Sequence, residues 1–245
     1  MQNIQTKQMV LADYFNPSLF KASAVNTAVR EIILVGGGAL FVSLLAQIAI
    51  RLPWTTVPIT GQTFGVLVVG GALGAWRGAS SLTVYMILGL LGANVYAPGN
   101  PGITGSWGVH FILPWKGTSG PIWDISSGGY IVGFIFAAFV TGWFAQKAWD
   151  RGPWGILAML AGNAIVYIPG LLWLYYLIST GWIHPLAQKP LGDLIAGSGD
   201  WDKTLKGGLY PFIIGDLMKL YLAALTLPAA WKLVNWIKNK KGQNQ

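Results

Sequence analysis

Long apolar stretches alternate with short polar segments along the chain, and this pattern predicts its secondary structure. A helix that crosses the hydrocarbon core of a membrane, about 30 Å thick, needs roughly 20 mostly apolar residues, and fewer where it is broken or buried among other helices. Six stretches qualify. They lie at Ile32–Ile50, Thr63–Trp76, Ser80–Ala97, Gly128–Ala145, Trp154–Ser179 and Leu209–Trp231. The pattern therefore predicts an all-α, polytopic membrane protein with a six-helix transmembrane bundle.

The second apolar stretch is short and contains the glycine-rich run VVGGALGA at residues 68–75. Small residues let helix backbones approach one another closely. We therefore expect this helix to pack inside the bundle and not to face lipid along its length.

The composition also indicates a membrane protein. Of the 245 residues, 53% are apolar and 10% are charged, whereas about 25% are charged in an ordinary soluble domain. The formal charge of +8 would suggest nucleic acid as the partner of a soluble protein. In a membrane protein it more often reflects Lys and Arg in cytoplasmic segments. We therefore expect a lipid membrane and no nucleic acid as partner.

The positions of the basic residues predict the orientation. Residues 1–30 lack the continuous apolar core of a cleavable signal peptide, so we expect insertion to use the six spans themselves. If the amino terminus is cytoplasmic, ten of the 16 Lys and Arg lie on cytoplasmic segments, five lie outside, and Lys219 lies within the last span. Both termini are then predicted to be cytoplasmic in a multi-pass protein of the plasma membrane. Residues 1–31 form a cytoplasmic or interfacial segment, 32–231 the transmembrane domain and 232–245 a basic cytoplasmic tail.

This orientation places residues 51–62, 98–127 and 180–208 on the external side. The last two segments are long, and long loops without secondary structure are uncommon in compact domains unless they form lids or binding loops. The functional opening is therefore predicted on the external side.

Several missing motifs narrow the function. The chain has no cysteine, and His110 and His184 alone are a poor basis for a metal site. No Gly-Lys dipeptide occurs, so the chain has no phosphate-binding loop with which to hydrolyse ATP itself. The sequence also lacks HExxH and GxSxG. Binding or transport is therefore favoured over catalysis, with no metal and no cofactor.

The last apolar stretch contains PFIIGDLMK, which places Asp216 and Lys219 three residues apart on one helical face. Ionisable residues within a membrane span are costly and usually functional. One interpretation is an ion pair that neutralises itself and fixes helix packing. The other, which we favour, is a clamp in which Asp216 accepts N–H hydrogen bonds from a ligand and Lys219 donates to a carbonyl or carboxylate.

Residues 54–63, WTTVPITGQT, join the first two spans and cannot form a plain helix. Irregular backbone at membrane depth must be satisfied by protein or ligand, so Thr60, Gln62 and Thr63 are candidates to line a polar pocket. Thr and Pro are also ordinary turn residues, and the spacing alone favours an external turn. Tyr85, Tyr130 and Tyr167 are further candidates in the spans, although most aromatic residues in such a bundle serve packing.

Small residues recur on the first span, where Ala39, Ser43 and Ala46 lie on one helical face. Such a stripe permits close helix contact. It indicates either packing within the bundle, which spacing slightly favours, or a surface that docks another membrane subunit.

Three motif blocks, taken together, resemble the BioY family. They read VPITGQTFGVLVVGGALGAWRGASSLTVYMILGLLGANVYAPG, then SSGGYIVGFIFAA, then PFIIGDLMK, within residues 55–225. The resemblance implies a six-helix S component of an energy-coupling-factor (ECF) transporter, which captures biotin outside the cell and delivers it inward. It also implies a transmembrane coupling protein and two ABC-type ATPases as partners, although some members are reported to work alone. Two departures are Asn94, where the family commonly has proline, and the longer 98–127 loop.

The resemblance assigns candidate roles to residues of this chain. It implies biotin binding by Asp216 and Lys219 and, through the PITGQT motif, by Thr60 and Gln62. Tyr85, Asn94, Tyr130 and Tyr167 are implied as pocket walls. Ala39 and Ser43, with Ala46, approximate the small-residue signature with which the family docks its coupling protein.

The leading hypothesis is therefore a biotin-binding membrane subunit that is not an enzyme. The alternatives are the same architecture with another small vitamin as ligand, an intramembrane enzyme that uses Asp216 as a base with Lys219 as its partner, and a purely structural subunit. The sequence leaves open whether the protein forms a homo-oligomer.

Overall fold

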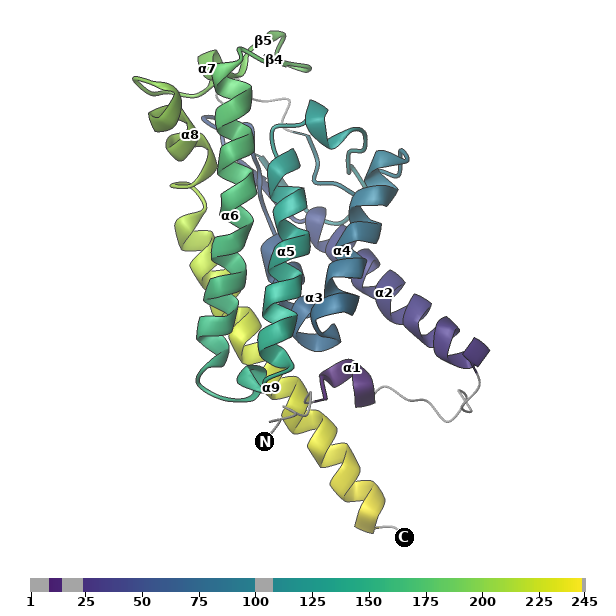
Figure 1. Cartoon of the computed structure of the whole chain (residues 1–245). Helices are drawn as coiled ribbons and strands as arrows, with labels where there is room; N and C mark the ends of the chain where they lie inside the picture. The colour runs from purple at the N-terminus through teal and green to yellow at the C-terminus, as the bar shows by residue number, and fades with distance from the viewer. Residues whose placement is uncertain (1–8, 15–23, 100–107, 244–245) are drawn as a thin grey trace, which may run out of the picture.

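A computed structural model describes residues 9–14, 24–99 and 108–243. Its helices pack lengthwise against one another (Figure 1). A helix lies in each of the predicted apolar stretches. These helices are α2 (Ala24–Ala46), α3 (Gln62–Leu73), α4 (Ala75–Leu90), α5 (Gly128–Ala145), α6 (Gly155–Ser179) and α9 (Ile213–Gln243).

Two of these helices have the predicted limits, because polar or glycine-rich segments flank them sharply. Helix α5 matches the expected Gly128–Ala145, and α6 begins one residue later than predicted. Helix α9 continues well past the expected end at Trp231, because the basic tail is helical too. Among the described helices, α2, α5, α6 and α9 are long and apolar enough to cross a membrane.

The predicted limits of other helices were wrong. Apolar sequence alone does not show where the backbone stops being helical. Helix α2 ends at Ala46, four residues early, because β1 (Ala49–Arg51) follows at once. Helix α4 begins at Ala75, directly after Gly74. The positive φ of Gly74, +87°, interrupts the helical backbone and separates α3 from α4. It ends at Leu90, just before Gly92, whose φ is +95°. Glycine adopts such positive φ values without the strain that a side chain would bring.

Helix α5 lies at the centre and packs against α3, α4 and α6. The close approach depends on glycines of the VVGGALGA run. A Cβ atom on Gly70 would lie 2.6 Å from the carbonyl oxygen of Ala138 in α5. Val66, Leu67, Val69 and the neighbouring glycines of α3 are buried. The expectation that this helix packs inside the bundle is confirmed.

The small-residue stripe on α2 is buried inside the chain. Ala39, Ser43 and Ala46 are each no more than 2% exposed, and α2 packs against α4 and α3. The Ser43 hydroxyl donates a hydrogen bond to the carbonyl oxygen of Ala39, 2.8 Å away. Assigning these residues to partner docking was therefore wrong, because surfaces already used in internal packing cannot meet another subunit. The internal-packing interpretation is the correct one.

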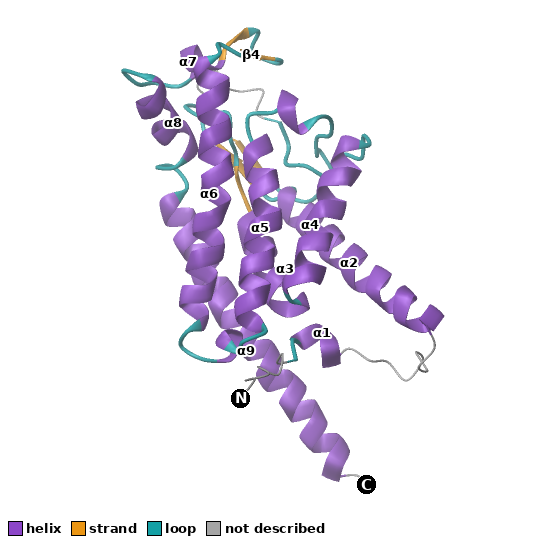
Figure 2. Cartoon of the chain, viewed as in Figure 1, coloured by secondary structure: helices purple, strands orange, loops and turns teal. Residues whose placement is uncertain are grey.

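The predicted external segments contain short β-strands. The fold is therefore mostly helical and not all-α as predicted. Strand β1 pairs antiparallel with β2 (Ile59–Thr60) on one side and with β3 (Gly108–His110) on the other. A second pair joins β4 (Ile183–His184) to β5 (Lys189–Pro190). Figure 2 shows the strands toward the end of the bundle that carries α7 (Leu191–Leu194) and α8 (Asp200–Gly208). Two 3₁₀ turns complete the described elements, η1 (Ile122–Asp124) and η2 (Trp149–Arg151).

The short helix α1 (Leu11–Tyr14) lies at the opposite end of the bundle, near the C-terminal part of α9 (Figure 1). The Arg77 side chain in α4 holds it there through an ion pair with Asp13, at 2.7 Å, and also pairs with Glu31 of α2. The Tyr14 ring packs edge-on against Trp231 of α9. Three long helices are thus tied together at this end.

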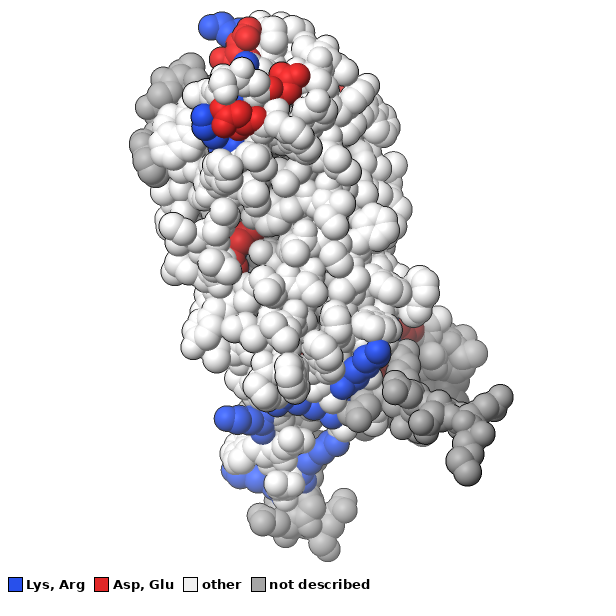
Figure 3. Space-filling model, turned by 60° about the vertical axis from the view of Figure 1, so that its left-hand side comes forward, with Lys and Arg blue, Asp and Glu red and all other residues white. Residues whose placement is uncertain are grey.

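Charged side chains avoid the middle of the molecule. On the face drawn in Figure 3, a wide middle zone is almost free of them, whereas Lys and Arg gather at the end that carries the C-terminal part of α9. Apolar side chains such as Ile32, Leu172 and Ile214 are 58–75% exposed along the bundle. A continuous apolar zone of this kind matches hydrocarbon and not water, so the chain is a membrane protein.

Candidate ligand-binding site

A cavity of about 500 Å³ lies within the bundle, toward the end that carries the predicted external segments. All three of these segments contribute to its wall, including Pro58, Ser119 and Leu186. The helices α3, α5, α6 and α9 supply most of the rest, and Tyr96, Ala97 and Phe212 complete it from outside the helices. This volume lies within the range of roughly 300–1,000 Å³ in which proteins usually bind small molecules.

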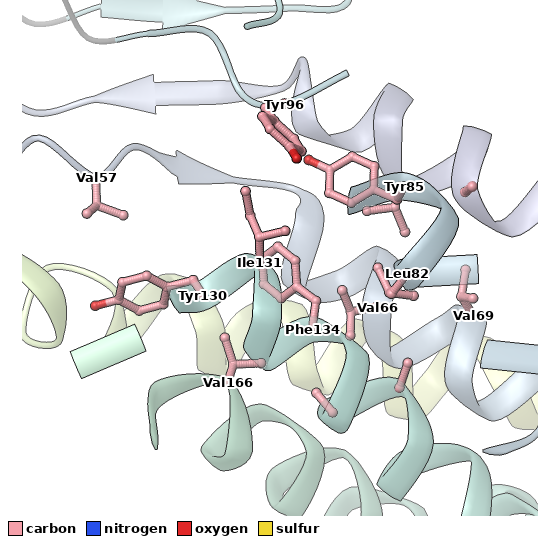
Figure 4. Packing of buried hydrophobic residues seen from close by; sticks show 14 of the residues in the cluster. Val57, Val66, Val69, Leu82, Tyr85, Tyr96, Tyr130, Ile131, Phe134 and Val166 are labelled. Atoms are coloured by element: carbon pink, nitrogen blue, oxygen red, sulfur yellow. The ribbon is translucent and has the colours of Figure 1, made fainter. Parts of the chain in front are cut away.

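The apolar part of the wall comes from a buried cluster shown in Figure 4. Val57, Ile131, Phe134 and Val166 belong both to this cluster and to the cavity wall. Tyr130 lies beside them, and its hydroxyl donates to the carbonyl oxygen of Gly208 at 2.8 Å. The wall therefore offers flat apolar surfaces to a ring system.

The polar part of the wall centres on Asp216, which is only 4% exposed. Its Oδ1 atom lies 2.5 Å from the Nζ atom of Lys219 and accepts a hydrogen bond from the Thr63 hydroxyl at 3.1 Å. Its Oδ2 atom accepts one from the Tyr167 hydroxyl at 2.5 Å. The three donors come from α9, α3 and α6. Asp216 thus joins three helices at the cavity surface.

Local sequence explains this position. Asp216 lies in the first turn of α9, where the helix dipole favours a negative charge. Lys219 follows one turn later on the same face, so the two side chains meet without strain. The ion pair of the first interpretation is present, and both residues also line the cavity, as the proposed ligand clamp requires.

A second set of hydrogen bonds extends from Lys219 across the wall. The Lys219 ammonium donates to the carbonyl oxygen of Thr60 at 2.9 Å. The Thr60 hydroxyl donates to Oε1 of Gln62 at 2.8 Å, and Nε2 of Gln62 donates to the Tyr85 hydroxyl at 2.6 Å. The segment 54–63 is therefore part of the cavity wall and not merely the external turn that its spacing favoured.

Seven of the predicted site residues line the cavity. They are Thr60, Gln62, Thr63, Tyr130, Tyr167, Asp216 and Lys219. Tyr85 lies behind the wall, fully buried, and touches the site through Gln62.

Asn94 does not line this cavity, which corrects its assignment as a pocket wall. Its side chain is exposed and accepts a hydrogen bond from the Ser119 hydroxyl at 2.9 Å. The reason is that α4 ends at Leu90, so Asn94 lies beyond the helix in an exposed loop.

Some wall residues were not predicted from the sequence. They lie on the predicted external segments and include Trp182, His184 and Ser127. Burial lowers the pKa of His184 below its ordinary value, which favours the neutral imidazole. Its Nδ1 atom accepts the backbone N–H of Ala187 at 3.2 Å, so the ring proton is on Nε2. No spacing signal marks His184, because it reaches the cavity on the two-residue strand β4, which pairs with β5. Among the described residues, no group of three His, Cys, Asp or Glu could hold a metal ion.

An apolar helix bundle with a polar cluster on the wall of a cavity of this size defines a membrane protein of the class that binds a small molecule. The BioY family model matches residues 20–236. The chain therefore belongs to the BioY family.

Two relatives are named biotin transporter BioY. The protein from Rhizobium etli is 28% identical over 208 residues, which cover 80% of this chain and 90% of the relative. The protein from Rhodobacter capsulatus is 32% identical over 201 residues, with coverage of 80% and 90%. A crystal structure of the S-component for biotin from an ECF-type ABC transporter superposes with a TM-score of 0.61 at 22% identity. It covers 86% of this chain and 95% of that one, and so shows a shared fold.

Proposed function

We propose that this protein captures biotin from the external side of the plasma membrane and delivers it inward, as the substrate-binding subunit of an ECF-type transporter. Family membership supports this proposal, as do the relatives named biotin transporters. The observation that carries it is the position of Asp216 and Lys219 together on the wall of a cavity of about 500 Å³.

The chemistry of the wall suits biotin. Its fused rings and valeryl chain need apolar walls, and its ureido group offers two N–H donors and one carbonyl acceptor. A carboxylate has about four lone-pair sites, and Asp216 receives three donors from the protein. One site is left for a ureido N–H. Lys219 has three N–H groups and uses two, on Asp216 and on the Thr60 carbonyl, so one is left for the ureido carbonyl.

The proposed topology has six membrane spans and two cytoplasmic termini. Helix α3 has 12 residues and is about 18 Å long, less than the membrane core. The segment that precedes it, which includes β1 and β2, completes the crossing inside the protein. ATP hydrolysis belongs to partner subunits in this proposal, namely two ABC-type ATPases that act through a transmembrane coupling protein.

Titration of biotin into the purified protein, beside a panel of other small vitamins, tests the function. We expect saturable binding of biotin at or below micromolar concentration. Binding of another vitamin with none of biotin would overturn the proposed substrate. Recovery of the bound ligand in chemically altered form would instead identify an enzyme.

A further inference from the structure

The charges on the cavity wall leave the carboxylate of an anionic ligand without a partner. Among the described wall residues, those with a formal charge are Asp124, Asp216 and Lys219, which is two carboxylates against one ammonium. A ligand carboxylate placed inside would add a further negative charge. Burying an unpaired charge is costly, so a cation beyond the wall residues is needed.

The Asp216 end of the cavity cannot meet this need. Lys219 already lies 2.5 Å from Asp216 and 2.9 Å from the carbonyl oxygen of Thr60. A second carboxylate here would compete for the same ammonium and be repelled by Asp216 at short range. The ligand carboxylate is therefore expected at the opposite, external part of the cavity.

Arg51 lies at that external part. It ends β1, and its guanidinium donates to the carbonyl oxygen of Gly99 at 3.3 Å. Gly99 is a wall residue, so the guanidinium lies directly behind the cavity rim. All eight Asp and Glu of the chain lie in the described ranges, and none of them forms a salt bridge with Arg51.

Lys116 adds a second cation to this region. The side chain is exposed and likewise forms no salt bridge with an Asp or Glu of the chain. Burial, assisted by the positive charges of Lys116 and Arg51, lowers the pKa of the neighbouring His110. Strand β1 pairs with β3 so that Arg51 faces Gly108 and Ala49 faces His110. The pairing places Arg51 at the strand that carries His110, and Lys116 follows this strand in the chain, so both cations lie near His110.

We propose that Arg51, with Lys116 beside it, recognises the carboxylate of the ligand at the cavity mouth, while Asp216 and Lys219 hold the uncharged head. This inference rests on the proposed function and gives the bound ligand a direction. Arg51 is then a specificity residue that selects anionic ligands, because a guanidinium recognises a carboxylate through paired N–H donors.

Comparing biotin with biotinamide, its uncharged primary amide, tests the inference. We expect the native protein to bind biotin more tightly than biotinamide, and increasingly so as the ionic strength is lowered. Arg51→Gln should weaken biotin binding roughly tenfold and leave biotinamide binding unchanged, so that the discrimination disappears. Unchanged biotinamide binding also shows that the variant is folded.

Three further variants sharpen the test. Arg51→Lys keeps the charge and should retain most of the preference for biotin over biotinamide. Lys116→Gln should reduce this preference less than Arg51→Gln does. Lys203→Gln removes a cation in α8, away from the cavity wall. It should change the affinity for neither ligand. Two results would overturn the inference while the proposed function stands. Arg51→Gln could lose affinity for biotin and biotinamide equally, or it could prefer biotin as strongly as the native protein does. A native protein that binds neither ligand would overturn the proposed function itself.

Discussion

Asp216 receives hydrogen bonds or an ion pair from donors on three helices, Thr63 on α3, Tyr167 on α6 and Lys219 on its own helix α9. A buried carboxylate needs such partners, because an unpaired charge at low dielectric is costly. The same partners hold the carboxylate at the cavity wall. One residue therefore combines a structural role with the proposed binding role.

Replacing Asp216 with Asn should weaken biotin binding by roughly ten- to a hundredfold, because a charge-assisted hydrogen bond contributes about 1.5–3 kcal/mol. The amide has nearly the same shape but presents an NH₂ group where the ligand needs an acceptor. Equilibrium titration measures the effect. Asp193→Asn in α7, an exposed acid outside the cavity wall, is the matched control. Unchanged affinity in Asp216→Asn would remove this residue from the site.

Two histidines on the predicted external segments, His110 and His184, indicate how stability depends on pH. Burial lowers the pKa of His184, and burial with nearby cations lowers that of His110. Histidine in the unfolded chain titrates near pH 6.5, so below this pH the unfolded state binds more protons than the folded state. The free energy of unfolding should therefore fall as the pH drops through about 6.5.

Thermal unfolding at about pH 7.5 and about pH 5.5 measures this dependence. The native protein should have the lower Tm at the acidic pH. A variant with both His110→Gln and His184→Gln should lose less of its Tm over the same interval. An equal loss in the double variant would show that other groups cause the acid sensitivity.

At the scale of elements, the glycines of α3 allow the central helices to touch. A Cβ atom on Gly70 would lie 2.6 Å from a backbone carbonyl of α5, which cannot move aside without moving the helix. Gly36 in α2 offers a contrast, because a Cβ atom there meets nothing within 4 Å. Replacement by alanine should therefore destabilise the protein at Gly70 but not at Gly36.

We expect Gly70→Ala to lower the free energy of unfolding by about 1–3 kcal/mol, the usual cost of overpacking. Gly36→Ala should leave it unchanged or raise it slightly, since alanine is the better helix former by about 1 kcal/mol. Thermal unfolding of both variants in the same detergent gives the comparison. A Gly70→Ala variant as stable as the native protein would contradict the close packing.

The elements differ in how well their sequences predict them. Helices α5 and α6 were predicted almost to the residue, because glycine or polar residues bound each apolar stretch. The end of α2 was missed because LAQIAIRLPW stays apolar while its backbone becomes a strand. Pairing of β1 with β3 joins residues far apart in sequence, and no local pattern marks it.

The site shows the same division. Asp216 and Lys219 were predictable because ionisable residues stand out in an apolar helix. His184 and Ser127 were not, because His184 lies in the two-residue strand β4 and Ser127 lies directly before α5, and no local pattern directs either one to the cavity. Asn94 was misplaced for the related reason that the end of α4 was misjudged by several residues, which moves the side chain from the helix face to an exposed loop.

At the scale of the whole molecule, cations concentrate at one end and both signs of charge lie at the other (Figure 3). Lys147 and Lys240 each lie over a Trp ring at the cation-rich end, at 3.5 and 4.2 Å from the ring centres. Such pairs suit a membrane–water interface, where the aromatic ring is apolar and the ammonium is wet. Together with the bias of Lys and Arg, they support a cytoplasmic location for this end in the proposed topology.

The absence of cysteine makes this topology directly testable, because any thiol introduced is the only one in the chain. Ser198→Cys places it just before α8, and Asn239→Cys places it on the exposed C-terminal part of α9. A membrane-impermeant maleimide added to intact cells should label Ser198→Cys at once and Asn239→Cys only after permeabilisation. The unmodified protein should stay unlabelled in both conditions. Labelling of Asn239→Cys in intact cells would reverse the orientation and place the cavity opening, with Arg51, on the cytoplasmic side.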